Sequence, residues 1–392
     1  MNKFWNIIKN NLTTVKHISA IGTADVVGTA ISSIFWLYLA SIMTVNGYGI
    51  VNYYIAIANI AATIALMGSE NTLRVYLPKG VKIQSTAYAI VFLSSAVTCL
   101  VLFLVYSKIE IIILTLSFVI SNLAIADTLG HKEFTAYSKF FVLQKILLVI
   151  FSIVLYYFLG TNGVILGLAI SFSPYIYQAV RGFSDSKICF ILIKERLAFF
   201  LTSFINTFTG VARGQVDKLI IAPMLGFELL GNYAFALQVV AVFMIFPNII
   251  YKYTVSTDSG GKSNTAVKKI TVLISIIISV IGATLSPIAI STFFPKYVLA
   301  TQAIQILSFH IIPATIALMI NSKFLAMEKN RFVLVGTIIS LSVNISGVVI
   351  LGPLFGIVGI SSGLVLGTVM ACVYLILVNN KMKSDESTSV IR

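Results

Sequence analysis

Long apolar runs follow one another along the whole chain and are separated by short polar stretches. Each run holds roughly 18 to 24 residues, enough for a helix to cross a hydrocarbon core of about 30 Å. Lipid offers the backbone no hydrogen-bond partners, so each run must be helical. The pattern predicts an all-α polytopic membrane protein of about twelve transmembrane helices, at residues 18–43, 50–70, 86–106, 111–130, 140–159, 163–180, 198–224, 230–250, 268–290, 301–322, 332–351 and 356–378.

Composition supports this interpretation. The chain is 58% hydrophobic and only 10% charged, whereas a soluble domain carries about 25% charged residues. Its cysteines, Cys99, Cys189 and Cys372, are far apart, and no Cys/His cluster occurs. The sequence therefore predicts neither a metal site nor a bound cofactor.

The positions of the basic residues predict the orientation in the membrane. Of the 27 Lys and Arg residues, only Lys145, Arg213 and Lys218 fall well inside predicted helices, and Lys268 and Lys269 are the first two residues of one that begins at the cytoplasmic side. Only Lys108 and Lys296 fall in odd-numbered loops, and all the others lie in even-numbered loops or at the termini. Cytoplasmic loops are enriched in Lys and Arg, so both termini are predicted to be cytoplasmic. The net charge of +14 is explained by this asymmetry and does not indicate nucleic-acid binding.

An internal repeat divides the chain near its middle. Three stretches of the first half parallel stretches of the second: 41–60 with 222–240, 127–134 with 325–332, and 161–171 with 354–364. Six helices per half give a parallel repeat, which suits alternating access by rocking of one half against the other. The predicted organisation is a six-helix bundle at 1–180, a cytoplasmic linker at 181–197, a second six-helix bundle at 198–378 and a cytoplasmic tail at 379–392.

Prolines are concentrated in the second half, at positions 223, 247, 287 and 313, with Pro174 as the single in-helix proline before residue 200. Each removes a helical hydrogen bond and can bend its helix. The short connections LGTNG and GPLFG are predicted to close antiparallel helix hairpins.

Four segments resemble the polysaccharide transporters of the multidrug/oligosaccharidyl-lipid/polysaccharide (MOP) exporter superfamily. They are MTVNGYGIVNYYIAIANIAATIALMGSENTLRVYLPKG (43–80), RGQVDKLIIAPMLGFELLGNYAFALQ (213–238), FFPKYVLATQAIQIL (293–307) and LGPLFGIVGISSGLVLG (351–367). The resemblance extends over nearly the whole chain. Its length and short loops look most like Wzx-type flippases of O-antigen and related repeat units.

This resemblance implies a fold, a function and partners. The fold would be MATE-like. The substrate would be an undecaprenyl-pyrophosphate-linked oligosaccharide, moved from the cytoplasmic to the outer leaflet of the bacterial inner membrane. A polysaccharide polymerase and a chain-length regulator would be further partners, and the chain itself would not be an enzyme.

The predicted seventh helix carries three charged residues, Arg213, Asp217 and Lys218. At 1.5 Å per residue, Arg213 lies ~22 Å along the helix, near the middle of the membrane. Charges there are costly and are candidates for function. Arg213 and Asp217 share a helix face and could simply neutralise each other. In the alternative, Arg213 and Lys218 bind the pyrophosphate in a central cavity.

Two further intramembrane residues are candidates for ion coupling together with Asp217. Asp25 has no basic residue within one turn, so its carboxyl could take up a proton. His310 lies in the tenth predicted helix and could titrate near neutral pH. The alternative for each is a hydrogen-bonded packing residue.

The cytoplasmic ends of the helices carry further charged groups. Glu70 and Arg74, and likewise Asp127 and His131, are spaced four apart and are predicted to form local pairs. Arg74 would also line the cytoplasmic opening. Lys145 either reaches the lipid headgroups or contacts the substrate phosphate.

Two alternative functions remain open on the sequence alone. A membrane-embedded polysaccharide polymerase or glycosyltransferase would use similar lipid-linked sugars. However, the predicted external loops are short and hold few acids, essentially Glu110 and Glu228, so paired carboxylates for acid–base catalysis are missing there. A multidrug or cation antiporter of the same superfamily is the second alternative.

Overall fold

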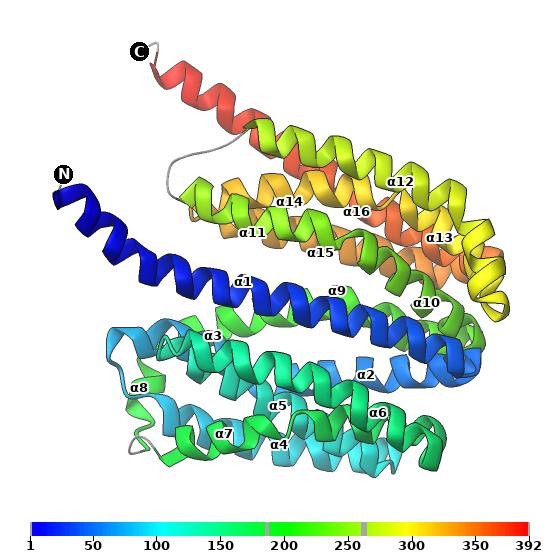
Figure 1. Ribbon diagram of the computed structural model, residues 1–392, viewed down its shortest axis with the longest axis horizontal. Coiled ribbons are helices and arrows are strands. Elements are labelled where there is room, and N and C mark those ends of the chain that lie inside the picture. The colour runs from blue at the N-terminus through cyan, green and yellow to red at the C-terminus, as the bar shows by residue number, and fades with distance from the viewer. Residues whose placement is uncertain (1, 185–187, 260–264, 391–392) are drawn as a thin grey trace. The chain divides into compact units, whose positions relative to one another are not determined.

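The computed structural model describes residues 2–184, 188–259 and 265–390, and every regular element in these ranges is helical (Figure 1). The first half contains α1 (Asn2–Ile42), α2 (Val45–Leu66), α3 (Ser69–Tyr76), η1 (Leu77–Lys79), α4 (Gln84–Tyr106), α5 (Ile109–Gly130), α6 (Phe134–Ser171), α7 (Pro174–Ser184) and α8 (Ile191–Lys194). The second contains α9 (Leu197–Leu225), α10 (Phe227–Phe243), α11 (Ile245–Ser259), α12 (Thr265–Phe293), η2 (Pro295–Tyr297), α13 (Ala300–Ser308), α14 (Ile311–Ala326), α15 (Asn330–Ser346), the π-helical η3 (Gly347–Leu351) and α16 (Gly352–Val390). The predicted all-α class is confirmed.

The helices group into two compact units. Unit 1 comprises Met1–Phe35 and Tyr54–Val211, and unit 2 comprises Trp36–Tyr53 and Ala212–Arg392. The division passes through α1, α2 and α9, each of which contributes to both units. Two six-helix bundles with a boundary at 181–197 therefore stay a prediction. Residues 185–187 of that linker, and 391–392 of the predicted tail, lie outside the described residues.

The chain is polytopic. In its described part, seven helices are long and apolar enough to cross a membrane, or nine if each of two bent helix pairs is one span. Two of the seven, Phe134–Ser171 and Asn330–Met382, contain a reversal of direction, since Gly163 packs on Leu155 and Gly363 packs on Gly347. Helix α9 is also long enough to cross but carries the three charges noted above. The number of twelve spans therefore stays a prediction.

Two glycines make these reversals. Gly160 has φ 60° and ψ −137°, and Gly356 has φ 56° and ψ −133°, a conformation that favours glycine. They are separated by half of the 392-residue chain. The same separation relates Lys132 (φ 62°) and Glu328 (φ 56°), which turn the chain before α6 and α15. The backbone thus repeats over half of the chain, in a register two to three residues away from the sequence parallels of 127–134 with 325–332 and of 161–171 with 354–364.

Two spans of unit 2 are bent. Helices α10 and α11 meet at 51°, and α13 and α14 meet at 42°. Each bend lies less than one turn before a proline, Pro247 or Pro313. Proline has no backbone N–H, so the carbonyl one turn earlier lacks its helical hydrogen bond. The proline ring also crowds that carbonyl, and both effects explain the bend. Pro223 and Pro287 lie inside the continuous helices α9 and α12.

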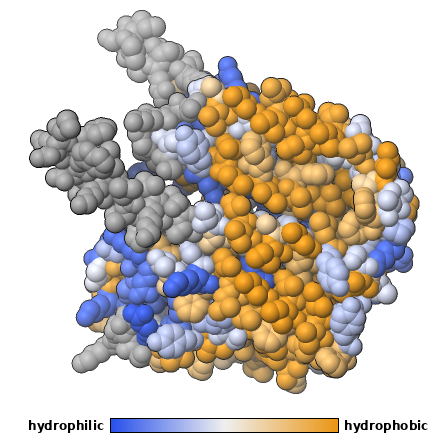
Figure 2. Space-filling model, in the orientation of Figure 1, coloured by the Kyte–Doolittle hydropathy of each residue, from blue (hydrophilic) through white to orange (hydrophobic). Residues whose placement is uncertain are grey.

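Helix α12 shows the sidedness expected in lipid. Its buried stripe is made of small and polar residues, Thr271, Ser275, Ser279, Gly282 and Ser286. The outward face is isoleucine, leucine and valine, and Figure 2 shows the resulting hydrophobic surface along α12. Small residues let neighbouring helices approach closely. In unit 1, Figure 2 shows hydrophilic residues gathered at the end that carries α3, α7 and α8.

In unit 2, α2 and α10 touch through two glycines. A Cβ atom on Gly49 would lie 2.0 Å from the Phe227 carbonyl oxygen, and one on Gly231 would lie 2.0 Å from that of Val45. These two glycines occupy corresponding places in the repeat, so the contact is nearly symmetric. Relieving either clash would require a helix backbone to move, because each added Cβ atom would meet main-chain atoms.

We therefore expect Gly49→Ala and Gly231→Ala each to lower the abundance of folded protein in the membrane severalfold, because overpacking costs about 1–3 kcal/mol. Gly210→Ala is the matched control, since a Cβ there meets nothing within 4 Å. Fluorescence-detected size exclusion of detergent extracts measures the folded fraction. Equal folded fractions for all three variants would contradict the close contact.

The end of α1 is held within unit 2 by Lys296. Its Nζ donates to the carbonyl oxygens of Ser41 (2.7 Å) and Met43 (2.5 Å). Partial burial lowers the pKa of this ammonium group. A cation at a helix C-terminus also interacts favourably with the helix dipole. One of the two basic residues predicted to lie outside the cytoplasm thus has a structural role.

Candidate functional site

The predicted site residues divide between the two units. Arg213, Asp217, Lys218 and His310 belong to unit 2. Asp25, Arg74 and Lys145 belong to unit 1.

In α9, Asp217 is almost fully buried, at 3% exposure. Its Oδ2 accepts a hydrogen bond from the Tyr233 hydroxyl of α10 at 2.9 Å. Its Oδ1 accepts one from the backbone N–H of Lys218 at 2.8 Å. Sequence reasoning missed Tyr233. Its position in an aromatic-rich helix was visible, but its orientation toward α9 was not.

Lys218 is buried as well, and its ammonium group turns back along its own helix. Nζ donates to the Gly214 carbonyl oxygen and to Oε1 of Gln215, the latter at 3.1 Å. The main-chain carbonyl and the amide satisfy two of its three donors. Lys218 is therefore held by α9 itself.

Arg213 does not pair with Asp217. In the described part of the chain, no hydrogen bond or ion pair reaches its guanidinium group. The predicted neutral pair is thus not formed, because Asp217 is directed to Tyr233. Arg213 is half-buried and keeps its five donors available.

His310 lies within electrostatic reach of Arg213, so the guanidinium charge acts on the imidazole. His310 lies between α13 and α14, at the 42° bend, and α14 begins at the following residue. Its Nδ1 is buried and has no hydrogen-bond partner within the described residues. Buried polar atoms are normally bonded, so an orphan one needs an explanation.

Together these features form what we term the α9/α14 site: the Arg213 guanidinium, the His310 imidazole and the N-terminus of α14. A helix N-terminus carries partial positive charge. In transporters, the half-helices of broken spans point such ends at anionic groups. The arrangement can bind an anion with at least one fixed positive charge and one imidazole N–H.

In unit 1, Tyr137 of α6 donates to Oδ1 of Asp25 of α1 at 3.0 Å. Tyr137 stacks on Phe141, with ring centroids 5.6 Å apart. Lys145, one turn further, places Nζ 5.1 Å from the centroid of the Phe141 ring. The exposed Arg74 lies within electrostatic reach of Tyr137. The structure thus brings Asp25, Arg74 and Lys145 to one region of unit 1.

The predicted pair of Asp127 and His131 is confirmed, with Nδ1 3.4 Å from Oδ1. His131 also lies 3.2 Å from the side-chain amide nitrogen of Gln84 through Nε2. Glu70 and Arg74, which were predicted to pair in the same way, interact through their charges but do not form a direct ion pair.

The bond between Tyr233 and Asp217 can be tested directly. Tyr233→Phe removes the donor and leaves a buried carboxylate with less compensation, which we expect to cost about 1–3 kcal/mol of stability. Tyr253→Phe, at a half-exposed position of α11, is the matched control. The midpoint of thermal unfolding in detergent is the measurement. Equal midpoints for the two variants would show that the hydroxyl does not stabilise Asp217.

Comparisons with known proteins give the context of the fold. No protein-family model and no curated protein sequence matches the chain. Among solved structures, it is similar to the lipid II flippase MurJ in an inward closed conformation (TM-score 0.72, 14% identity), over 93% of this chain and 87% of that one.

It is also similar to an inward-facing MATE-family multidrug resistance transporter of the MOP superfamily (TM-score 0.72, 13% identity), over 92% of this chain and 96% of that one. A third match is a MOP-superfamily transporter from Pyrococcus furiosus (TM-score 0.63, 14% identity), over 94% of this chain and 96% of that one. The chain is a multi-pass membrane protein with the fold that these transporters and this flippase share.

Proposed function

We propose that the chain is a flippase for undecaprenyl-pyrophosphate-linked oligosaccharide repeat units. It would carry them from the cytoplasmic to the outer leaflet of the inner membrane by alternating access, for O-antigen or another surface polysaccharide. The observation that carries this proposal is that Arg213 and the buried Nδ1 of His310 have no partner among the described residues, while the Arg213 charge reaches the His310 imidazole.

The chemistry of the α9/α14 site favours a phosphate. An intramembrane positive charge is costly unless a ligand or water compensates it. Guanidinium groups bind phosphate oxygens through two parallel hydrogen bonds. A neutral or cationic drug would leave this charge uncompensated. A pyrophosphate would satisfy both groups while its polyprenyl chain stays in lipid.

A MATE-like antiporter is the second candidate, and a specific observation favours it. Each unit contains a carboxylate that accepts a hydrogen bond from a tyrosine: Asp25 from Tyr137, and Asp217 from Tyr233. Such carboxylates could exchange protons or cations during transport. In the flippase proposal, the same groups would supply ion coupling together with His310.

The two candidates predict different consequences of deleting the gene. A flippase deletion should leave lipid-linked repeat units on the cytoplasmic leaflet and reduce surface glycan. An antiporter deletion should leave surface glycan unchanged and increase sensitivity to cationic drugs. Surface glycan is measured by lectin binding to intact cells, and the intracellular pool by extraction of lipid-linked sugars. Normal surface glycan, in a strain with no other flippase, would rule out the proposal.

We further propose that both termini are cytoplasmic. Single cysteines at Val298 and Lys381, both exposed, should then differ in labelling by an impermeant thiol reagent. In intact cells of a variant without its native cysteines, Val298→Cys should react and Lys381→Cys should react only after permeabilisation. The opposite pattern would reverse the orientation.

A further inference from the structure

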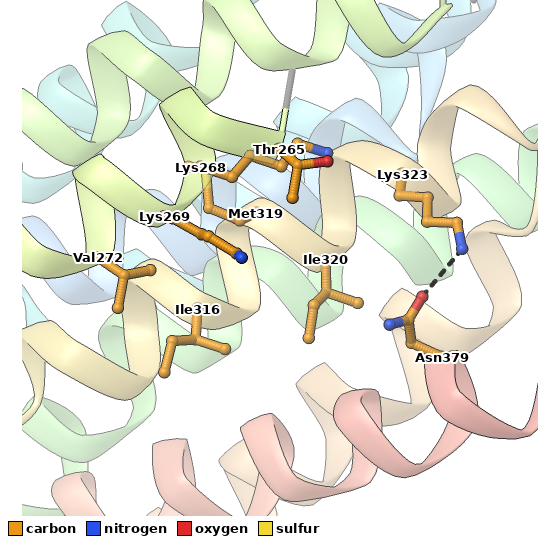
Figure 3. A pocket seen from close by; sticks show the side chains of 9 residues that line it. All are labelled: Thr265, Lys268, Lys269, Val272, Ile316, Met319, Ile320, Lys323 and Asn379. Carbon is orange, nitrogen blue, oxygen red and sulfur yellow. Dashed lines mark hydrogen bonds between the residues drawn. The ribbon is translucent and has the colours of Figure 1, made fainter. Parts of the chain in front are cut away.

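A cavity of about 450 Å³ lies within unit 2, away from the α9/α14 site. Its lining comes from α12, α14 and α16, as Figure 3 shows: Thr265, Lys268, Lys269, Val272, Ile316, Met319, Ile320, Lys323 and Asn379. Helix α12 begins at this end of the unit and α14 ends there. By the distribution of basic residues, this end is the proposed cytoplasmic one.

The cavity is rich in positive charge. Lys268 is neutralised by Asp258, with Nζ 2.5 Å from Oδ2. Lys323 donates to the side-chain oxygen of Asn379 at 3.1 Å (Figure 3). Lys269 is exposed, and no hydrogen bond or ion pair joins it to another described residue. Figure 3 shows its ammonium group among the labelled side chains that surround the cavity.

The rest of the lining is apolar, from Val272, Ile316, Met319 and Ile320. The helices beside it expose large apolar side chains, such as Leu273 of α12 (58% exposed) and Leu377 of α16 (64% exposed). These surfaces are suited to acyl chains. The cavity therefore combines a lysine-lined part with an apolar part that continues onto lipid-facing surface.

We propose that this cavity binds the phosphate of an anionic glycerophospholipid of the cytoplasmic leaflet, with Lys269 and Lys323 as its ligands. Basic pockets between transmembrane helices on the cytoplasmic side bind such headgroups. A free phosphate ion would make no use of the apolar lining. The site is separate from the proposed transport reaction, and its occupancy can be measured without transport.

The experiment uses the purified full-length protein in a neutral detergent. Thermal unfolding is followed while dioleoylphosphatidylglycerol, dioleoylphosphatidylcholine, inorganic phosphate or undecaprenyl pyrophosphate is added. Phosphatidylglycerol should raise the unfolding midpoint at far lower concentration than phosphatidylcholine. In Lys269→Gln/Lys323→Gln, the half-saturating concentration of phosphatidylglycerol should rise about thirtyfold, because two basic contacts are lost.

The matched control is Arg331→Gln/Lys381→Gln, which removes two positive charges from exposed positions of α15 and α16. It should behave like the unchanged protein. An equal response of both double variants to phosphatidylglycerol would overturn the proposal. So would an equal effect of inorganic phosphate, or stabilisation by undecaprenyl pyrophosphate with none by phosphatidylglycerol.

Discussion

Arg213→Gln is expected to lower transport of the lipid-linked oligosaccharide about a hundredfold, because a charged hydrogen bond to a desolvated phosphate contributes about 1.5–3 kcal/mol. Arg213 makes no ion pair with a described residue, so its loss breaks no internal pair. Protein abundance should therefore stay close to normal while transport falls. The measurement is surface glycan in a complemented deletion strain, divided by the amount of protein in the membrane.

Two variants control for this effect. Arg331→Gln makes the same chemical change at an exposed residue of α15 and should leave transport unchanged. Arg213→Lys keeps the charge but loses the planar, two-pronged geometry, so it should retain part of the activity. Full transport by Arg213→Gln would remove this residue from substrate binding.

Asp258→Ala is expected to have the largest effect on stability, about 3–5 kcal/mol, because it leaves a buried Lys268 without its partner. The side chains of this pair are 4% and 15% exposed. Asp258 also accepts a hydrogen bond from Ser322 of α14 at 2.7 Å, so it connects α11, α12 and α14. The unfolding midpoint in detergent should fall sharply, and the amount of protein in the membrane should fall with it.

Glu195→Ala is the matched control for this prediction. Glu195 pairs with Arg196 at 3.0 Å, but its side chain is 58% exposed, and exposed pairs contribute about 0–1 kcal/mol. Asp258→Leu with Lys268→Met should recover most of the lost stability, because no unpaired charge remains. If Asp258→Ala were as mild as Glu195→Ala, the pair would not stabilise unit 2.

The backbone of the fold follows from the sequence with little ambiguity. Apolar runs of membrane length predict the helices. The half-chain repeat predicts equivalent turns in the two halves, but the parallel of 161–171 with 354–364 pairs Gly163 with Gly356. The torsion angles instead pair Gly160 with Gly356, three residues away from the predicted register. Prolines predict bends, and a proline lies just after the bend in each of the two bent spans of unit 2.

The partners of the buried charges could not be predicted in the same way. Spacing places Arg213 and Asp217 on one face of α9, which suggested a pair. The spacing contains no information about Tyr233, which lies on the next helix, α10, and donates a hydrogen bond to the Asp217 carboxylate. Likewise, His310 is a candidate from the sequence, but its position at a bend, within electrostatic reach of Arg213, depends on how α13 and α14 pack.

The most direct test of the central claim is a flipping measurement with purified protein. Vesicles are prepared with the protein and a fluorescent undecaprenyl-pyrophosphate oligosaccharide in both leaflets, and an impermeant quencher is added outside. With the unchanged protein and with Arg331→Gln, the fluorescence of both leaflets is expected to be quenched. With Arg213→Gln, quenching should stop at the outer leaflet. Quenching confined to the outer leaflet with the unchanged protein, under both an imposed proton and an imposed sodium gradient, would contradict the flippase assignment.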